Sequence, residues 1–150
     1  LWDNYPDSLT IPLTGKASHA YLLLAGSTNH MQCHIANGVI RVHYADGTSE
    51  TLELINPDNW CPIEQDFYVD GIAFCLQTPR PYRLHFKSGL VSNNLEKDLN
   101  ITGVYGRSID GGAGVLLDML LDPHKELKSL TLETLSNDVV IGIMGITLQK

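Results

Sequence analysis

The residues best suited to chemistry lie between positions 56 and 71. These sixteen residues hold four carboxylates, three aromatic rings and three side-chain amides. An aromatic ring can stack on the apolar face of a sugar, while carboxylates and amides pair with its neighbouring hydroxyls. The segment is therefore interpreted as a carbohydrate-binding surface, formed by Asn59, Trp60, Glu64, Gln65, Asp66 and Tyr68.

Two other roles fit the same residues. Trp60 and Phe67 could plug the end of a β-sandwich while the acids cap turns, because a lone tryptophan in a β domain is most often core. Glu64 and Asp66 could instead serve a hydrolase. On an extended strand, however, they share one face and cannot flank a substrate bond from opposite sides. The sequence therefore predicts no catalytic residues.

Two groups of residues contain metal-ligating atoms, but neither has the spacing of a known metal site. Oxygens of Asp58, Asn59, Glu64 and Asp66 could bind calcium, but the regular ligand spacing of a known calcium loop is absent. His30, Cys33 and His34 lie within five residues, yet no second cluster completes a zinc site. We expect no metal and no other cofactor.

Two smaller features are read as structural. Cys33, Cys61 and Cys75 are odd in number, so a disulfide framework is not expected and the thiols are interpreted as small buried hydrophobes. The glycine-rich residues 111–114 lack the Lys-Ser/Thr of a phosphate loop. They are interpreted as a sharp turn or bulge.

Composition narrows the class of partner. The chain has 150 residues, 43% hydrophobic composition and a formal charge of -7. It should therefore fold as one domain over residues 1–150 and repel phosphate backbones, which argues against nucleic acid. No apolar run approaches the roughly 20 residues of a membrane-spanning helix, so membrane insertion is not expected. Because the chain begins with Leu1 and not Met, we expect a piece of a longer multidomain protein.

The elements expected to position these residues are short strands. Strict alternation of apolar and polar residues on either side of Asp46-Gly47 predicts a hairpin within residues 38–55, with a tight turn that uses two positive φ angles. Residues 19–25 are continuously apolar, which predicts a central strand covered on both faces. Leucines at 116, 117, 120 and 121 would also fit one face of a short helix, but the flanking Gly and Pro favour a strand. Further strands are expected at 8–13, 82–86, 115–121, 130–133 and 139–148.

Eight or nine strands without long interleaved helices predict an all-β fold, an antiparallel jelly-roll β-sandwich. The two long irregular stretches, 56–81 and 87–112, are the places where loops would carry function.

Several segments in order along the chain resemble the galactose-binding-like jelly roll. They are residues 20–28 (AYLLLAGST), 42–48 (VHYADGT), 56–66, 127–132 (LKSLTL) and 140–143 (VIGI). More narrowly, the chain is similar to the β-sandwich region attached to six-hairpin glycosidases of gut-bacterial polysaccharide-utilisation systems, a family of unknown function.

The resemblance implies a non-catalytic accessory module of a glycoside-hydrolase-like protein, secreted or periplasmic. Such a module would pack on the parent helical-barrel catalytic domain, bind a plant or host glycan weakly, or do both. It transfers no catalytic residue, since the acids are expected on the barrel. A structural or protein-interaction domain without ligand is the alternative, and exposure of Trp60, Tyr68 or Tyr82 would favour binding over that role.

Overall fold

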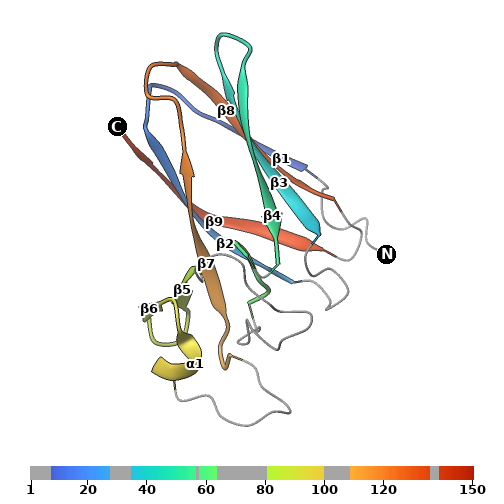
Figure 1. The fold of residues 1–150 in the computed structure, drawn as a ribbon, viewed down its shortest axis with the longest axis vertical. Coiled ribbons are helices and arrows are strands. Elements are labelled where there is room, and N and C mark those ends of the chain that lie inside the picture. Colours follow the sequence, from blue (N-terminus) through green and yellow to red (C-terminus); the bar gives the residue numbers. More distant parts are fainter. Residues whose placement is uncertain (1–7, 28–34, 57, 64–80, 100–108, 136–138) are drawn as a thin grey trace.

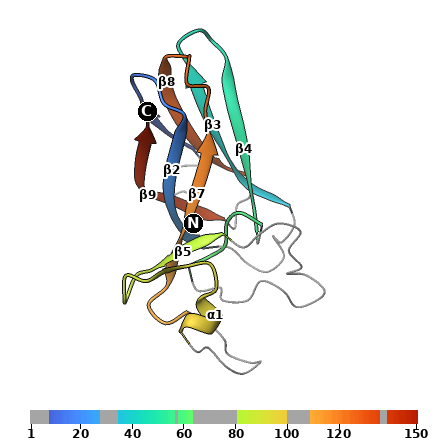
Figure 2. The same ribbon diagram turned by 60° about the vertical axis from the view of Figure 1, so that its left-hand side comes forward.

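Two antiparallel β-sheets form the structure and pack face to face as a β-sandwich (Figures 1 and 2). The computed structural model describes residues 8–27, 35–56, 58–63, 81–99, 109–135 and 139–150. All eight strands that the sequence predicts, with the two arms of the hairpin counted separately, coincide with strands of the structure. The prediction of an all-β sandwich is confirmed.

The first sheet has four strands in the order β1-β8-β3-β4. The second has five, in the order β6-β5-β7-β2-β9. The four strands of the first sheet are β1 (Ser8–Pro12), β8 (Leu127–Thr134), β3 (Ala36–Tyr44) and β4 (Ser49–Ile55). Those of the second are β6 (Val91–Ser92), β5 (Tyr82–His85), β7 (Ala113–Leu120), β2 (His19–Ser27) and β9 (Val140–Gln149).

The chain wraps in nested pairs. β1 pairs with β8 in one sheet, and β2 and β7, the strands that follow β1 and precede β8 along the chain, pair in the other. Early and late strands of the chain that pair in turn on opposite sheets give the wrapping expected of a jelly roll.

Alternating side chains build the core between the sheets. On β8, Leu130 and Leu132 are buried, whereas the intervening Thr131 is half-buried on the outer side. The same period of two recurs on β2 and β3, so each strand gives one row to the interior. The fully buried members include Leu22, Leu24, Ile40, Val42, Leu54, Trp60 and Leu130.

The structure contains one short helix that the sequence does not predict. α1 (Leu95–Asp98) follows β6, and the side chain of Asn94 caps it by accepting a 3.2 Å hydrogen bond from the Lys97 amide. Four residues are too few for any helical periodicity to show. α1 lies with β5 and β6 at one end of the sandwich, opposite the β3–β4 hairpin (Figure 1).

Two local predictions need correction. β2 does lie between two neighbours, β7 and β9, but its outer face is not covered, because Tyr21 is 40% exposed. The hairpin turn is also longer than expected: the Tyr44 carbonyl accepts from the Gly47 amide, and Tyr44 then pairs with Thr48. Gly47 takes a positive φ of 89°, as the last residue of a three-residue loop does.

Two sequence readings are confirmed nearby. Gly111 and Gly112 take positive φ values of 83° and 76°, so the glycine-rich segment is a sharp turn before β7. The strand expected at 82–86 is present as β5, which begins at Tyr82, directly after Pro81, a residue without an N–H to donate to a sheet.

Candidate functional site

Asn59 has a structural role at the end of β4. Its side-chain Oδ1 accepts a 2.8 Å hydrogen bond from the Ile55 amide, and its Nδ2 donates to the Glu53 carbonyl at 2.7 Å. Both ends of the amide are therefore used to fold the chain back on itself after the strand. This leaves one acceptor lone pair and one N–H for anything else.

Trp60 lies in the core with no exposed surface. Its indole Nε1 donates a 2.8 Å hydrogen bond to Oδ1 of Asn37, which is equally buried. The expectation that Trp60 stacks on a sugar is wrong, because its ring faces the interior between the two sheets. The other residues of the predicted surface, Glu64, Gln65, Asp66 and Tyr68, lie outside the described part of the chain, as does Phe67.

The residues after Trp60 are anchored by a buried cation. The guanidinium of Arg83, 1% exposed, donates to the carbonyls of Pro62 at 2.8 Å and Ala113 at 3.0 Å. Cys61 is also buried, at 1% exposure, as the reading of the thiols as small hydrophobes expects for this one. Cys33 and Cys75 lie outside the described residues. Residues 59–63 therefore serve to close the end of the sandwich.

Within the described ranges, no group of three or more His, Cys, Asp or Glu side chains lies close enough to hold a metal ion. Of the calcium candidates, Asn59 already bonds backbone groups through its side-chain Oδ1 and Nδ2, and one oxygen of Asp58 is buried without a hydrogen-bond partner among these residues. His30, Cys33 and His34 fall outside the described ranges.

An aromatic surface lies instead on the outer face of the five-stranded sheet, which we call the tyrosine face. It contains Tyr21 on β2, 40% exposed, and Tyr82 on β5, 55% exposed. Directly paired residues of antiparallel strands point to the same side of a sheet. Tyr82 pairs with Leu116 on β7, and Leu116 pairs with Leu23 on β2, two residues from Tyr21, so both tyrosines share this face.

Polar groups hold the Tyr21 end of this face in place. The rings of His19 and Tyr21 are parallel to within 1°, with centroids 5.5 Å apart. His19 Nδ1 lies 2.8 Å from an oxygen of Asp118, and the Tyr21 hydroxyl donates to Gln149 Oε1 at 2.8 Å. Two rings, a carboxylate and an amide therefore meet on one exposed sheet face.

This is the combination of groups that the sequence analysis assigned to residues 59–68. The sequence could not show it here, because the residues come from four strands and their proximity depends on the pairing of β2 with β7 and β9. Tyr82, whose exposure we expect to favour binding over a purely structural role, is exposed.

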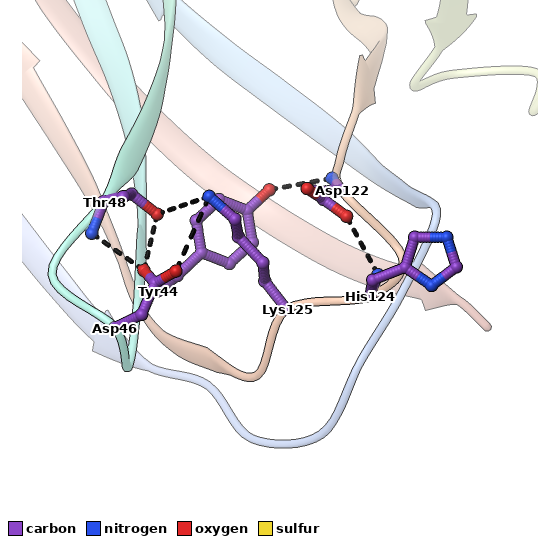
Figure 3. A network of polar contacts seen from close by, with 6 residues as sticks. All are labelled: Tyr44, Asp46, Thr48, Asp122, His124 and Lys125. Atoms are coloured by element: carbon purple, nitrogen blue, oxygen red, sulfur yellow. Dashed lines mark hydrogen bonds and ion pairs between the residues drawn. The ribbon is translucent and has the colours of Figure 1, made fainter.

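A second polar cluster joins two loops at the end of the sandwich that holds the β3–β4 hairpin (Figure 3). The Lys125 ammonium lies 2.9 Å from the Thr48 hydroxyl and 3.5 Å from Asp46 Oδ2, and 5.4 Å above the Tyr44 ring. The Tyr44 hydroxyl accepts a 2.9 Å hydrogen bond from the Asp122 amide. These contacts fasten the β3–β4 turn to the β7–β8 connection.

The environment of the cluster shifts two of its titrating groups. Burial raises the pKa of the Tyr44 hydroxyl, and the nearby Glu50 carboxylate acts in the same direction. Hydrogen bonds from the Thr48 hydroxyl and amide lower the pKa of the exposed Asp46 carboxyl. Both pKa shifts arise from the packing and the hydrogen bonds that hold the two loops together. The His124 ring points away from the cluster (Figure 3).

The described part of the chain contains no helix long and apolar enough to cross a membrane. Comparison of the chain with protein-family models, with curated proteins and with solved structures finds no match. Because no related protein guides the choice of a site, we select the tyrosine face on the geometry of this chain alone.

Proposed function

We propose that this chain is a non-catalytic carbohydrate-binding module of a glycoside-hydrolase-like protein, and that it binds glycan on the tyrosine face. The observation that carries the proposal is the exposure of Tyr21 and Tyr82 on one sheet face, beside Asp118 and Gln149. The resemblance to the galactose-binding-like jelly roll supports the same class of ligand.

The spacing of the tyrosines favours an oligosaccharide. Their positions differ by two strands across the sheet and by two residues along it, which places their Cα atoms about 12 Å apart. One sugar ring cannot cover both side chains, whereas a short glycan chain can. Leu23 and Leu116 lie between them and offer an apolar floor for the less polar faces of the sugars.

The chemistry of the face favours binding over hydrolysis. A glycosidase needs two carboxyl groups on opposite sides of the bond that it cleaves. Asp118 is held by His19, and the described outward residues that neighbour it on β2 and β9, Tyr21 and Thr147, are not acids. The arrangement can orient hydroxyls but has no second acid there to complete the reaction.

Titration with glycans tests the proposal. Plant and host oligosaccharides are added to the labelled protein while amide resonances are followed, and shifts are expected around residues 19–23, 82 and 116–118. Shallow sites of this kind bind weakly, with Kd values in the millimolar to high-micromolar range, about -4 to -6 kcal/mol.

Substitutions at Tyr21 separate stacking from hydrogen bonding. Tyr21→Ala and Tyr82→Ala should each abolish the shifts, while Tyr21→Phe, which keeps the ring and loses only the contact with Gln149, should retain most of the affinity. Absence of shifts with every glycan at tens of millimolar, in the folded protein, would overturn the proposal.

A second function is favoured by the apolar residues at the margins of the five-stranded sheet. Leu120 is 69% exposed and Met144, at a bulge in β9, is 58% exposed. These side chains would suit packing against the parent helical-barrel catalytic domain that the resemblance implies. A reading frame without such a domain beside these 150 residues would argue against it, and would also remove the basis for a secreted or periplasmic location.

A further inference from the structure

A shallow pocket of about 370 Å³ lies at one end of the four-stranded sheet, on the opposite side of the sandwich from the tyrosine face. Strands β1, β3 and β8 and the β3–β4 turn contribute its walls. The lining residues are Thr10, His43, Tyr44, Gly47, Thr48, Lys128, Ser129 and Thr131.

A β-bulge places the only lysine of this lining. His43 pairs with Ser129, but the next residue of β3, Tyr44, pairs with Leu127, so Lys128 is the extra residue on β8. Bulges of this kind turn a side chain away from the regular alternation. Lys128 and Ser129 consequently both line the pocket, although they are neighbours in sequence.

Several polar side chains of the pocket make no hydrogen bond to another described residue and could donate to a ligand. Among the described residues, no hydrogen bond or ion pair engages the side chains of His43, Lys128 or Ser129. The hydroxyls of Thr10 and Thr131 share one hydrogen bond of 3.2 Å, which leaves one of their two protons to donate elsewhere.

The charge of the lining is opposite to that of the whole chain. The chain carries a formal charge of -7, yet its acidic residues are absent from the lining. Asp46, in the turn, already accepts from the Thr48 amide and hydroxyl and faces Lys125. Glu133, further along the same sheet face, is paired with Arg41 at 2.8 Å.

We propose that this pocket binds an oxyanion: an inorganic sulfate or phosphate, or the sulfate or carboxylate group of an acidic sugar. Lys128 supplies the positive charge, and the hydroxyls of Ser129 and Thr131 with the His43 ring supply directed donors, the combination that holds a multi-oxygen anion. The inference is independent of the proposed function, because the pocket and the tyrosine face lie on opposite sheets.

The test is a titration at constant ionic strength, held with chloride. Sodium sulfate, sodium phosphate, galactose 6-sulfate, glucuronic acid and neutral galactose are added separately to the labelled protein. Saturable amide shifts at residues 43, 47–48 and 128–131 are expected with at least one anion and not with galactose. Sulfate or phosphate binding without the sugar acids would assign the site to a free ion, and tighter binding of a sugar acid would assign it to an acidic glycan.

Variants make the test specific. Lys128→Ala should weaken binding at least about fivefold, the effect of removing one charged hydrogen-bond donor. Lys97→Ala makes the same change in net charge on α1, at the far end of the sandwich, and should leave the affinity unaltered. Thr131→Val removes a donor without altering charge and should also weaken binding.

Three outcomes would overturn the inference. They are shifts that do not saturate, equal affinity for galactose and the anions, and equal loss of binding in the Lys97→Ala and Lys128→Ala proteins. Because the tyrosine-face resonances are separate, failure here leaves the glycan proposal unaffected, and the reverse also holds.

Discussion

Trp60 and Asn37 form a hydrogen-bonded pair in the interior, with 2.8 Å between the indole Nε1 and the side-chain Oδ1 and no exposed surface on either residue. Asn37 stands at the register shift near the start of β3, where a bulge turns its side chain inward. The contact joins the segment after β4 to the beginning of β3. It makes Trp60 a closing residue of the sandwich.

Removal of the indole N–H should therefore destabilise the domain even when the ring is replaced by another ring. Trp60→Phe is expected to lower the free energy of unfolding by about 1–3 kcal/mol, since a buried acceptor loses its donor. Trp60→Ala should cost about 3–5 kcal/mol because it also opens a cavity. Urea unfolding measures both, and a double-mutant cycle with Asn37→Ala should show coupling. A fully stable Trp60→Ala protein would contradict the burial of this residue.

Gly26 is required by the close approach of Trp60 and β9. A Cβ atom at this position would lie 2.1 Å from the Val140 carbonyl oxygen and 3.0 Å from the Trp60 ring. Gly26→Ala should destabilise the domain by about 1–3 kcal/mol or more, because the first of these atoms belongs to the backbone of a paired strand. Gly145→Ala is the matched control, since a Cβ there meets nothing within 4 Å. Equal thermal stability of the two variants would show that β9 can shift at no cost.

The β3–β4 turn makes a separate demand on Gly47. Its φ of 89° is unfavourable for a β-branched residue, although a Cβ there would meet no atom within 4 Å. Gly47→Val should lower the free energy of unfolding by on the order of 1 kcal/mol or more, through backbone strain alone. Gly47→Asn should be milder, since Asn tolerates a positive φ. An unchanged melting temperature for Gly47→Val would mean that the turn differs from the one described.

The strands could be predicted because their cause is local. Alternation of residues such as Ile40 and Val42 with Arg41 is a property of neighbouring positions, and the Asp46-Gly47 dipeptide marks the reversal between them. The length of the turn was missed because either of two loop geometries accommodates the same dipeptide. The structure has the three-residue loop, in which the Asp46 carboxylate accepts a hydrogen bond from the Thr48 amide.

The candidate site could not be predicted for a physical reason. Whether an indole faces inward or outward depends on its partner, and the partner of Trp60 is 23 residues away in sequence. Tyr21 and Tyr82 come together only through β7, which pairs with both of their strands. Composition led us to expect carbohydrate binding, whereas which side chains share an exposed sheet face depends on strand register.

The last prediction concerns the acid stability of the β3–β4 turn. The hydrogen bonds from Thr48 lower the pKa of Asp46 from its ordinary value of 3.8, with a smaller contribution from Lys125. A carboxyl whose pKa is lower in the folded than in the unfolded state stabilises the fold above its unfolded pKa. This contribution is lost as the pH falls through the folded pKa. The stability difference between the wild type and Asp46→Asn should therefore shrink progressively below about pH 4.

Titration of the Asp46 carboxyl by NMR checks the cause of the shift. Thr48→Val removes the hydroxyl that contributes most, so the pKa of Asp46 should rise toward 3.8. Lys125→Gln should raise it less, because the ammonium lies 3.5 Å from the carboxylate at the protein surface, where water screens the charge. If Lys125→Gln raised the pKa of Asp46 more than Thr48→Val did, the ion pair and not the hydroxyl would hold the turn.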